Sequence, residues 1–144
     1  MDTLSLKNNL KIFLFCILFI NCQHKDDKGY ILKNQLPIIS IGNGSEEEIV
    51  NSKLILKRND TNIDTGNLIV YSKSDNTIDV EISLKKTDTI YKTDLIVVFI
   101  KDKCFTLSEI EKKALVTSGR PFILSYKINQ KQFVDRNGIY VLPK

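Results

Sequence analysis

The stretch that decides the fold is Thr77-Ile78-Asp79-Val80-Glu81-Ile82-Ser83-Leu84-Lys85. Its apolar side chains fall on every second residue, and polar side chains stand between them. Successive side chains of a strand point to opposite faces, so this period of two predicts a strand with one buried and one solvated face. Residues 122–128 repeat the pattern, with Phe122, Leu124, Tyr126 and Ile128 on one face. A sheet with one packed face is therefore expected.

The composition of the whole chain agrees with a sheet. The 144 residues include twenty Ile but only one Ala and no Trp, and β-branched residues favour strands over helices. With 42% hydrophobic and 26% charged residues, the chain has the balance of one globular domain. Turn signals rich in Gly and Asn recur between the apolar runs. The sequence predicts an all-β fold, a small antiparallel β-sandwich.

Two further segments refine this expectation. Leu95 to Ile100 is a run of six apolar residues, which is typical of a central strand covered on both faces. Near the end of the chain, the pair Asn137-Gly138 lies between Phe133-Val134 and the apolar run 139–142. Asn-Gly favours the tight turns of β-hairpins, so a closing hairpin is expected here.

One segment has the pattern of a helix. Thr106-Leu107-Ser108-Glu109 matches a capping box, in which the first and fourth side chains bond the free amides of a first helical turn. Leu107, Ile110 and Ala114 then follow at helical spacing, before a glycine and a proline. The sequence predicts one short α-helix over about 106–117, and an α+β domain is the alternative fold class.

The beginning of the chain has the pattern of a secretory signal. The polar segment from Met1 to Lys11 carries two lysines and precedes nine apolar residues, Ile12 to Ile20. A bilayer-spanning helix needs about 20 apolar residues, so this run is too short to span. A positive segment before a short apolar core is typical of a signal peptide, whose lysines stay on the cytoplasmic side.

The four residues Phe19-Ile20-Asn21-Cys22 end this apolar run, and they resemble the lipobox of bacterial lipoproteins. The family favours Leu where Phe19 stands and a smaller residue where Asn21 stands. The resemblance implies that the Cys22 thiol receives a diacylglycerol, that the signal peptide is cut before Cys22, and that the new amine is acylated, for example with palmitate. It thus implies a signal peptide at 1–21, a lipidated Cys and tether at 22–28, and a single β-rich domain at 29–144.

Two other readings of the N-terminal segment are an uncleaved anchor and an ordinary secretory signal in which Cys22 is incidental. The three cysteines fit the lipoprotein reading, because Cys16 would be removed, Cys22 would be a thioether, and Cys104 would remain free. Without acylation, an oxidising exterior would permit a bridge between Cys22 and Cys104. Cys104 follows two lysines, which can activate its thiol. Because Cys104 also lies beside Phe105, we favour the interpretation that it is a small buried hydrophobic side chain.

The best candidate for a metal site is the set Asp60, Asn62 and Asp64. Oxygen ligands at alternate positions resemble the first half of a calcium loop. The match then fails, because Gly66 comes one position late and Tyr71 occupies the place of the last carboxylate ligand. We favour a long hairpin turn in this segment, and expect no metal and no cofactor.

No catalytic set can be drawn from the sequence, so we do not expect an enzyme. The single imidazole, His24, lies in the tether, where it cannot be held against a nucleophile. Asp79 and Glu81 share a strand face, but alternating acids on a wet face usually serve solubility. The acidic run 46–48 is expected on a loop or at a strand entrance.

The expected function is that of a non-catalytic protein-binding or structural module, exported and lipid-anchored on the periplasmic face of a bacterial membrane or on the cell surface. Its partners would be the membrane, through the N-terminal lipid, and an envelope protein. Nucleic acid is not expected, because the basic residues form no dense stripe. The alternative is a small-ligand or glycan-binding lipoprotein with a cleft lined by several tyrosines. An enzyme that uses carboxylates or Cys104 is less favoured. The tyrosines in question are Tyr71, Tyr91, Tyr126 and Tyr140, for which we favour core or cross-strand packing.

Overall fold

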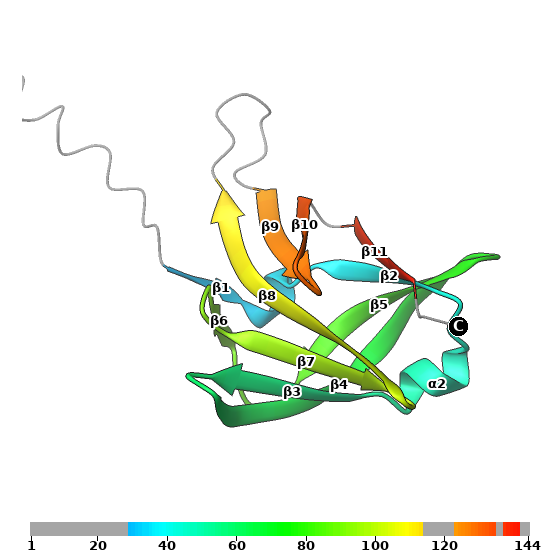
Figure 1. Cartoon of the computed structure of the whole chain (residues 1–144), viewed down its shortest axis with the longest axis horizontal. Coiled ribbons are helices and arrows are strands. Elements are labelled where there is room, and N and C mark those ends of the chain that lie inside the picture. The colour runs from blue at the N-terminus through cyan, green and yellow to red at the C-terminus, as the bar shows by residue number, and fades with distance from the viewer. Residues whose placement is uncertain (1–28, 114–122, 135–136, 142–144) are drawn as a thin grey trace, which may run out of the picture.

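A curled nine-stranded sheet forms most of the computed structural model, which describes residues 29–113, 123–134 and 137–141 (Figure 1). The elements in chain order are β1 (Tyr30–Leu32), a 3-10 turn η2 (Lys33–Gln35), β2 (Ile38–Gly42), α2 (Glu46–Val50), β3 (Lys53–Arg58), β4 (Thr61–Lys73), β5 (Thr77–Leu84), β6 (Thr89–Tyr91), β7 (Leu95–Ile100), β8 (Lys103–Lys113), β9 (Ile123–Ile128), β10 (Lys131–Val134) and β11 (Asn137–Val141). The all-β class predicted from the sequence is confirmed.

The strand order of the large sheet is β10-β9-β8-β7-β3-β4-β5-β2-β11. Its neighbours are antiparallel except for β11, which runs parallel to β2. The sheet curls so far that its two end strands, β10 and β11, come into contact (Figure 1). A separate pair, β1 and β6, lies at one end of the curled sheet and packs against β8. Opposite walls of the curled sheet thus face each other across one core, in a sandwich-like arrangement.

The core is built from the alternating apolar side chains of the strands. In β5 the side chains of Ile78, Val80, Ile82 and Leu84 are all buried. Burial of such an apolar face stabilises the fold by about 25 cal/mol for every Å² of apolar surface that is removed from water. The largest buried side chains are the aromatic rings of Phe105 and Tyr126.

The predicted central strand over Leu95 to Ile100 is confirmed as β7, which lies between β3 and β8. Its expected burial on both faces is wrong. Ile96 and its even-numbered neighbours are buried, whereas the side chain of Phe99 on the other face is 38% exposed. A continuous apolar run therefore marks a strand here, but only one of its faces enters the core.

The helix predicted over about 106–117 is wrong for every residue that the structure describes, because residues 103–113 form the strand β8. The register with β9 shifts between Ser108 and Glu111, and Glu109 has a φ of 51°. This bulge inserts an extra residue, so Leu107 and Ile110 both point into the core although they are three positions apart. A bulged strand has thus produced the spacing of a helix. Residues 114–117 lie outside the described residues.

The one α-helix of the described residues is α2, and it begins where a loop or strand entrance was expected. The Ser45 hydroxyl accepts a hydrogen bond from the Glu48 N–H at 3.2 Å, and the Glu48 carboxylate accepts one from the Ser45 N–H at 3.2 Å. This reciprocal pair is a capping box. The three acidic residues of the first turn also favour the positive end of the helix dipole. None of the described helices is both long and apolar enough to cross a membrane.

The expected hairpin around Asn137-Gly138 is also wrong. β10 pairs with β9 through the turn Asn129-Gln130, whose residues both have positive φ, whereas β11 pairs with β2. Turn residues with positive φ match the twist of antiparallel strands, and Asn129 adopts this conformation readily. The Asn-Gly pair begins a strand that crosses to the other end of the sheet.

Candidate functional site

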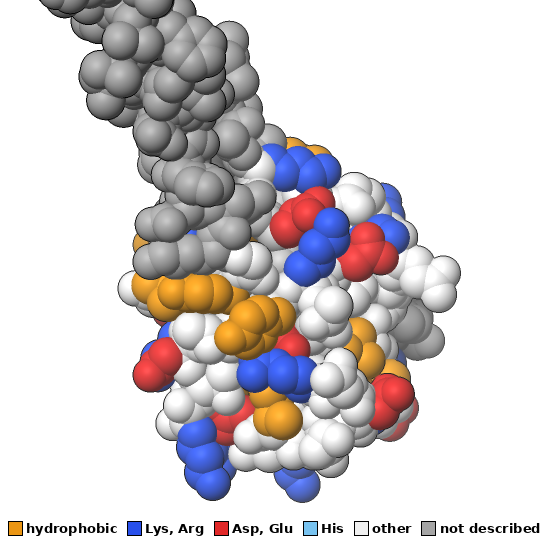
Figure 2. Space-filling view, turned by 90° about the vertical axis from the view of Figure 1, so that its left-hand side faces the viewer, with side chains coloured by type: hydrophobic (Ala, Val, Ile, Leu, Met, Phe, Trp, Pro, Cys, Tyr) orange, Lys and Arg blue, Asp and Glu red, His pale blue; other side chains and the backbone are white. Residues whose placement is uncertain are grey.

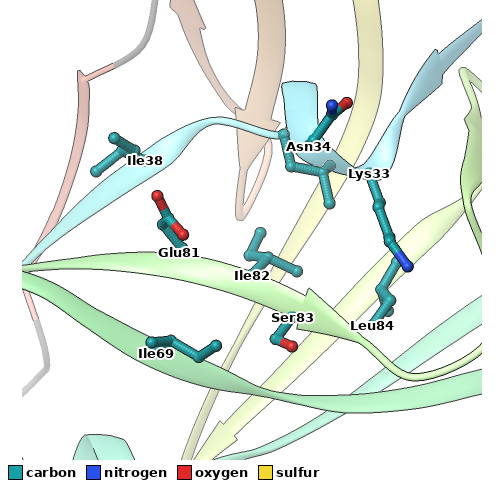
Figure 3. A pocket seen from close by; sticks show the side chains of 9 residues that line it. Lys33, Asn34, Ile38, Ile69, Glu81, Ile82, Ser83 and Leu84 are labelled. Carbon is teal, nitrogen blue, oxygen red and sulfur yellow. The ribbon is translucent and has the colours of Figure 1, made fainter.

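An open notch lies beside β5, where β2 leaves the sheet. β5 pairs with β4 from Ile78 to Leu84, but with β2 only from Thr77 to Val80. Among the described residues, β5 has a strand neighbour on one side only beyond Val80. The β5 notch, as we call this space of about 410 Å³, is lined by Lys33, Asn34, Leu36, Ile38, Ile69, Glu81, Ile82, Ser83 and Leu84 (Figure 3).

The local sequence explains why β2 leaves the sheet at this point. Ile39 lies opposite Val80, so continuing the register would place Pro37 opposite Ile82. Proline has no N–H to donate to the next ladder bond, and the chain turns away into η2. The turn is closed by the Leu36 N–H, which donates to the Lys33 carbonyl at 3.2 Å. A single proline therefore ends the pairing of β2 with β5.

The main chain of β5 presents two residues to this notch. The Lys85 N–H donates to the Thr65 carbonyl of β4 at 3.1 Å. Antiparallel strands alternate between bonded and non-bonded pairs, so Ser83 also bonds toward β4. The Ser83 carbonyl oxygen also lies on the β4 side, because it is only 1.8 Å from the position that a Cβ atom on Gly66 of β4 would occupy. The N–H and C=O groups of Ile82 and Leu84 must then face the notch.

These four main-chain groups of β5 form an unpaired strand edge, although Ile82 and Leu84 as whole residues are only 7% and 5% exposed. The described parts of η2 and β2 make no backbone hydrogen bond to Ile82 or Leu84. An unpaired strand edge is a template for a further strand, and proteins normally cover or interrupt it. Here η2, which carries Lys33 and Asn34, lies opposite the edge (Figure 3) and makes no backbone hydrogen bond to it.

The side chains around the notch are apolar in the middle and charged at the two ends. Leu36, Ile38 and Ile69 contribute apolar surface, and the Ile69 side chain is 48% exposed. Figure 3 places Glu81 beneath Ile38 at one end and Lys33 beside Leu84 at the other. Lys33 forms an ion pair with Asp88 at 2.6 Å.

The two carboxylates that the sequence placed on one strand face have different surroundings. Asp79 accepts hydrogen bonds from the Ser40 hydroxyl at 2.5 Å and the Ser72 hydroxyl at 2.6 Å, and these bonds lower the pKa of Asp79. Glu81 is exposed and lines the notch. Asp79 therefore joins β2, β4 and β5, whereas Glu81 is available to a partner.

The candidate calcium ligands lie on a hairpin that is tighter than the sequence suggested. Asn59 and Asp60 form its turn, both with positive φ, and β4 begins at once with Thr61, so Asn62 is already part of the strand. The long hairpin turn that we favoured is therefore wrong. No group of three or more His, Cys, Asp and Glu side chains suited to a metal is found among the described residues.

Asp64, the third candidate ligand, is buried in β4 and serves as a backbone anchor. Its carboxylate accepts hydrogen bonds from the N–H groups of Thr65, Lys86 and Thr87 at 2.7, 2.9 and 2.7 Å. Burial raises the pKa of Asp64, but these backbone hydrogen bonds outweigh it and hold the pKa below its ordinary value. Asp64 thus fixes the loop that follows β5 and borders the notch.

The remaining sequence candidates that the structure describes do not form a common site. Cys104 is exposed, so its expected burial beside Phe105 is wrong, since only Phe105 enters the core. Among the tyrosines, Tyr126 is in the core and Tyr71 is exposed. Cys22, His24 and the side chain of Tyr140 lie outside what the structure describes.

A second polar cluster, which the sequence analysis did not predict, lies at the β1–β6 end. Arg58 at the end of β3 binds the fully buried carboxylate of Asp94, and its guanidinium carbon lies 4.3 Å from the centre of the Tyr91 ring. Tyr91 also packs edge-on against Tyr30 of β1 at 5.9 Å, which confirms cross-strand packing for this tyrosine. Arg58 gave no signal in the sequence, because its partner lies 36 residues away.

Comparison with known proteins finds no relative of this chain. No protein-family model, curated protein or solved structure matches it.

Proposed function

We propose that this protein is an exported lipoprotein of a bacterial envelope whose domain binds another protein without catalysis. The observation that carries the proposal is the sequence from Met1 to Cys22, in which lysines and a nine-residue apolar core lead to a lipobox-like cysteine. A diacylglyceryl group supplies two acyl chains and N-acylation a third. Stable anchoring takes at least two such signals, so the domain would stay on a membrane without a spanning helix.

The start of β1 sets how far the domain stands from its anchor. Tyr30, the first residue of β1, follows Cys22 by eight residues. An extended chain covers at most about 3.6 Å per residue, so β1 begins no more than about 29 Å from the lipidated residue. The start of β1 would therefore stay within about 29 Å of the membrane surface in any orientation of the tether.

The surface at this end suits such a position. The side chains of Leu32 on β1 and Tyr91 on β6 are 41% and 39% exposed. The space-filling view shows hydrophobic side chains gathered on the face that carries β1 and β6, with both basic and acidic side chains around them (Figure 2). Amphipathic rings and basic groups are favourable at a lipid interface.

The β5 notch, in contrast, offers an apolar cleft and an open strand edge, which supports binding of a protein.

The alternative function, binding of a small ligand or glycan, predicts a cleft lined by several tyrosines. None of the residues that line the β5 notch is a tyrosine. Its open backbone edge suits a polypeptide better than a sugar, which supports protein binding over the alternative.

The anchor is tested by mass spectrometry of the protein purified from the membrane fraction of a bacterial host. We expect a mature chain that begins at Cys22 and carries a diacylglyceryl adduct. Cys22→Ser should leave an unprocessed chain with no adduct, whereas Cys104→Ser should be processed normally. A chain that still begins at Met1, or one released without lipid, would refute the proposal.

A further inference from the structure

We infer that the β5 notch binds an extended segment of a partner protein, which adds as a strand to the open edge at Ile82 and Leu84. The inference rests on the proposed function, because it names the surface and the kind of partner for the protein binding proposed there. Addition of a strand to an exposed sheet edge is a recurrent mode of peptide recognition, in which main-chain hydrogen bonds provide affinity and side-chain pockets provide specificity.

The main chain of β5 identifies the occupant as polypeptide. Ile82 and Leu84 present two N–H donors and two C=O acceptors in one row, at the spacing of alternate strand residues. A segment in strand conformation offers the complementary row of acceptors and donors. The free edge from Glu81 to Leu84 is four residues long, or about 13 Å at 3.3 Å per residue. It therefore accommodates a strand of three or four residues.

The walls of the notch specify the side chains of this segment. Leu36, Ile38 and Ile69 favour apolar side chains on the segment that enters the cleft. Glu81 is exposed, and no described cation pairs with its carboxylate. Lys33, at the other end, already has Asp88 as its partner. A segment with apolar residues and one basic residue opposite Glu81 is therefore the complementary ligand.

The experiment uses the full chain in its own membrane, with the photo-crosslinking residue benzoylphenylalanine placed at Ser83 or at Lys85. These positions are two residues apart on the same side of the β5 strand and its continuation. We expect both to form an adduct with the same protein, and mass spectrometry should place the two attachment points about two residues apart in one continuous segment. Benzoylphenylalanine at Asp102, an exposed residue of the β7–β8 turn, is the control site and should give no such adduct.

A charge variant then tests the predicted basic residue. Glu81→Lys should lower the yield of the Ser83 adduct by about two- to five-fold, as expected when an exposed charge pair becomes a repulsion. Asp102→Lys makes the same change of charge away from the notch and should leave the yield unchanged. Equal yields from the two variants would remove the basic residue from the proposed ligand.

The results separate this inference from the proposed function. A lipidated protein whose Ser83 site gives no adduct above the Asp102 control would overturn strand addition and leave the anchor standing. So would attachment to a glycan or a lipid, or to residues scattered over a folded surface. An adduct of the expected register on a chain without lipid would support the notch and overturn the anchor.

Discussion

The guanidinium group of Arg58 binds the carboxylate of Asp94 through two parallel hydrogen bonds, from Nε to Oδ1 at 2.8 Å and from Nη2 to Oδ2 at 2.7 Å. The same carboxylate accepts the Tyr91 N–H at 2.9 Å, and Arg58 also donates to the Thr89 carbonyl at 3.3 Å. The pair therefore holds β6 against the end of β3. Because β1 pairs with β6, it also holds β1, the first strand of the described residues.

Removing the cation of this pair should be costly. We expect Arg58→Met to lower the free energy of unfolding by about 3 kcal/mol, because the buried Asp94 carboxylate then loses its counter-charge. Lys101→Met, which removes the exposed ion pair with Glu48, should cost less than about 1 kcal/mol. Urea unfolding of both variants gives the comparison, and similar costs would contradict a structural role for Arg58.

Gly66 of β4 should tolerate no side chain. A Cβ at this position would lie 1.8 Å from the carbonyl oxygen and 2.9 Å from the carbonyl carbon of Ser83, and both atoms belong to the backbone of β5. We expect Gly66→Ala to destabilise the domain by about 3 kcal/mol, since the two strands must move apart. Gly29→Ala is the matched control, because nothing lies within 4 Å of that position. Thermal melting of both should show a lower midpoint for Gly66→Ala alone.

The free thiol offers a direct readout of the processing of the chain. If 1–21 are removed and Cys22 is acylated, Cys104 is the remaining thiol, and it is exposed in the folded domain. The native protein from the membrane should therefore react with one equivalent of maleimide without denaturant. Cys104→Ser should abolish this reaction and change stability by less than about 0.5 kcal/mol. Two or three equivalents on the denatured protein would show that Cys22 is not acylated.

The sequence predicted the strands better than it predicted how they meet. Alternation along β5 follows from local chemistry, and it correctly gave both the strand and its buried face. The capping-box pattern at Thr106 did not begin a helix. The side chains of Phe105 and Leu107 are buried in the core, and they keep this segment in the strand β8. Ser45 follows Gly44 and Asn43, which has a φ of 60°, so the same motif there does begin a helix.

The notch could be predicted only in part. Pro37 is a visible signal that a strand ends, but the residue that it would face across the sheet, Ile82, follows from a register that joins residues more than forty positions apart. Such long-range pairings depend on the packing of the whole sheet and not on local preference. For the same reason the sequence showed Asp64 only as one of three weak candidate metal ligands, whereas the fold brings the N–H groups of Lys86 and Thr87 to its carboxylate.

The anchoring role of Asp64 predicts a specific dependence on pH. The pKa of Asp64 lies below its unfolded value of 3.8, so the folded protein binds this proton less readily than the unfolded chain does. The stabilisation is therefore fully present above about pH 4 and is lost as the pH falls through the folded pKa. Asp64→Asn keeps the shape but removes the charge, and it should cost about 2 kcal/mol at pH 7, in the range for hydrogen bonds to a charged group.

The acid range provides the decisive comparison for Asp64. The difference in unfolding free energy between the original protein and Asp64→Asn should shrink as the pH is lowered from 5 toward 3, because the unfolded chain then takes up a proton at Asp64 more readily than the folded protein does. Asp75→Asn, at an exposed position in the β4–β5 turn, should stay within about 0.5 kcal/mol of the original protein throughout. A cost for Asp64→Asn that is the same at pH 7 and at pH 3 would mean that shape, and not charge, holds the loop. The pH series thus decides whether the loop beside the β5 notch is fixed by an ionised carboxylate.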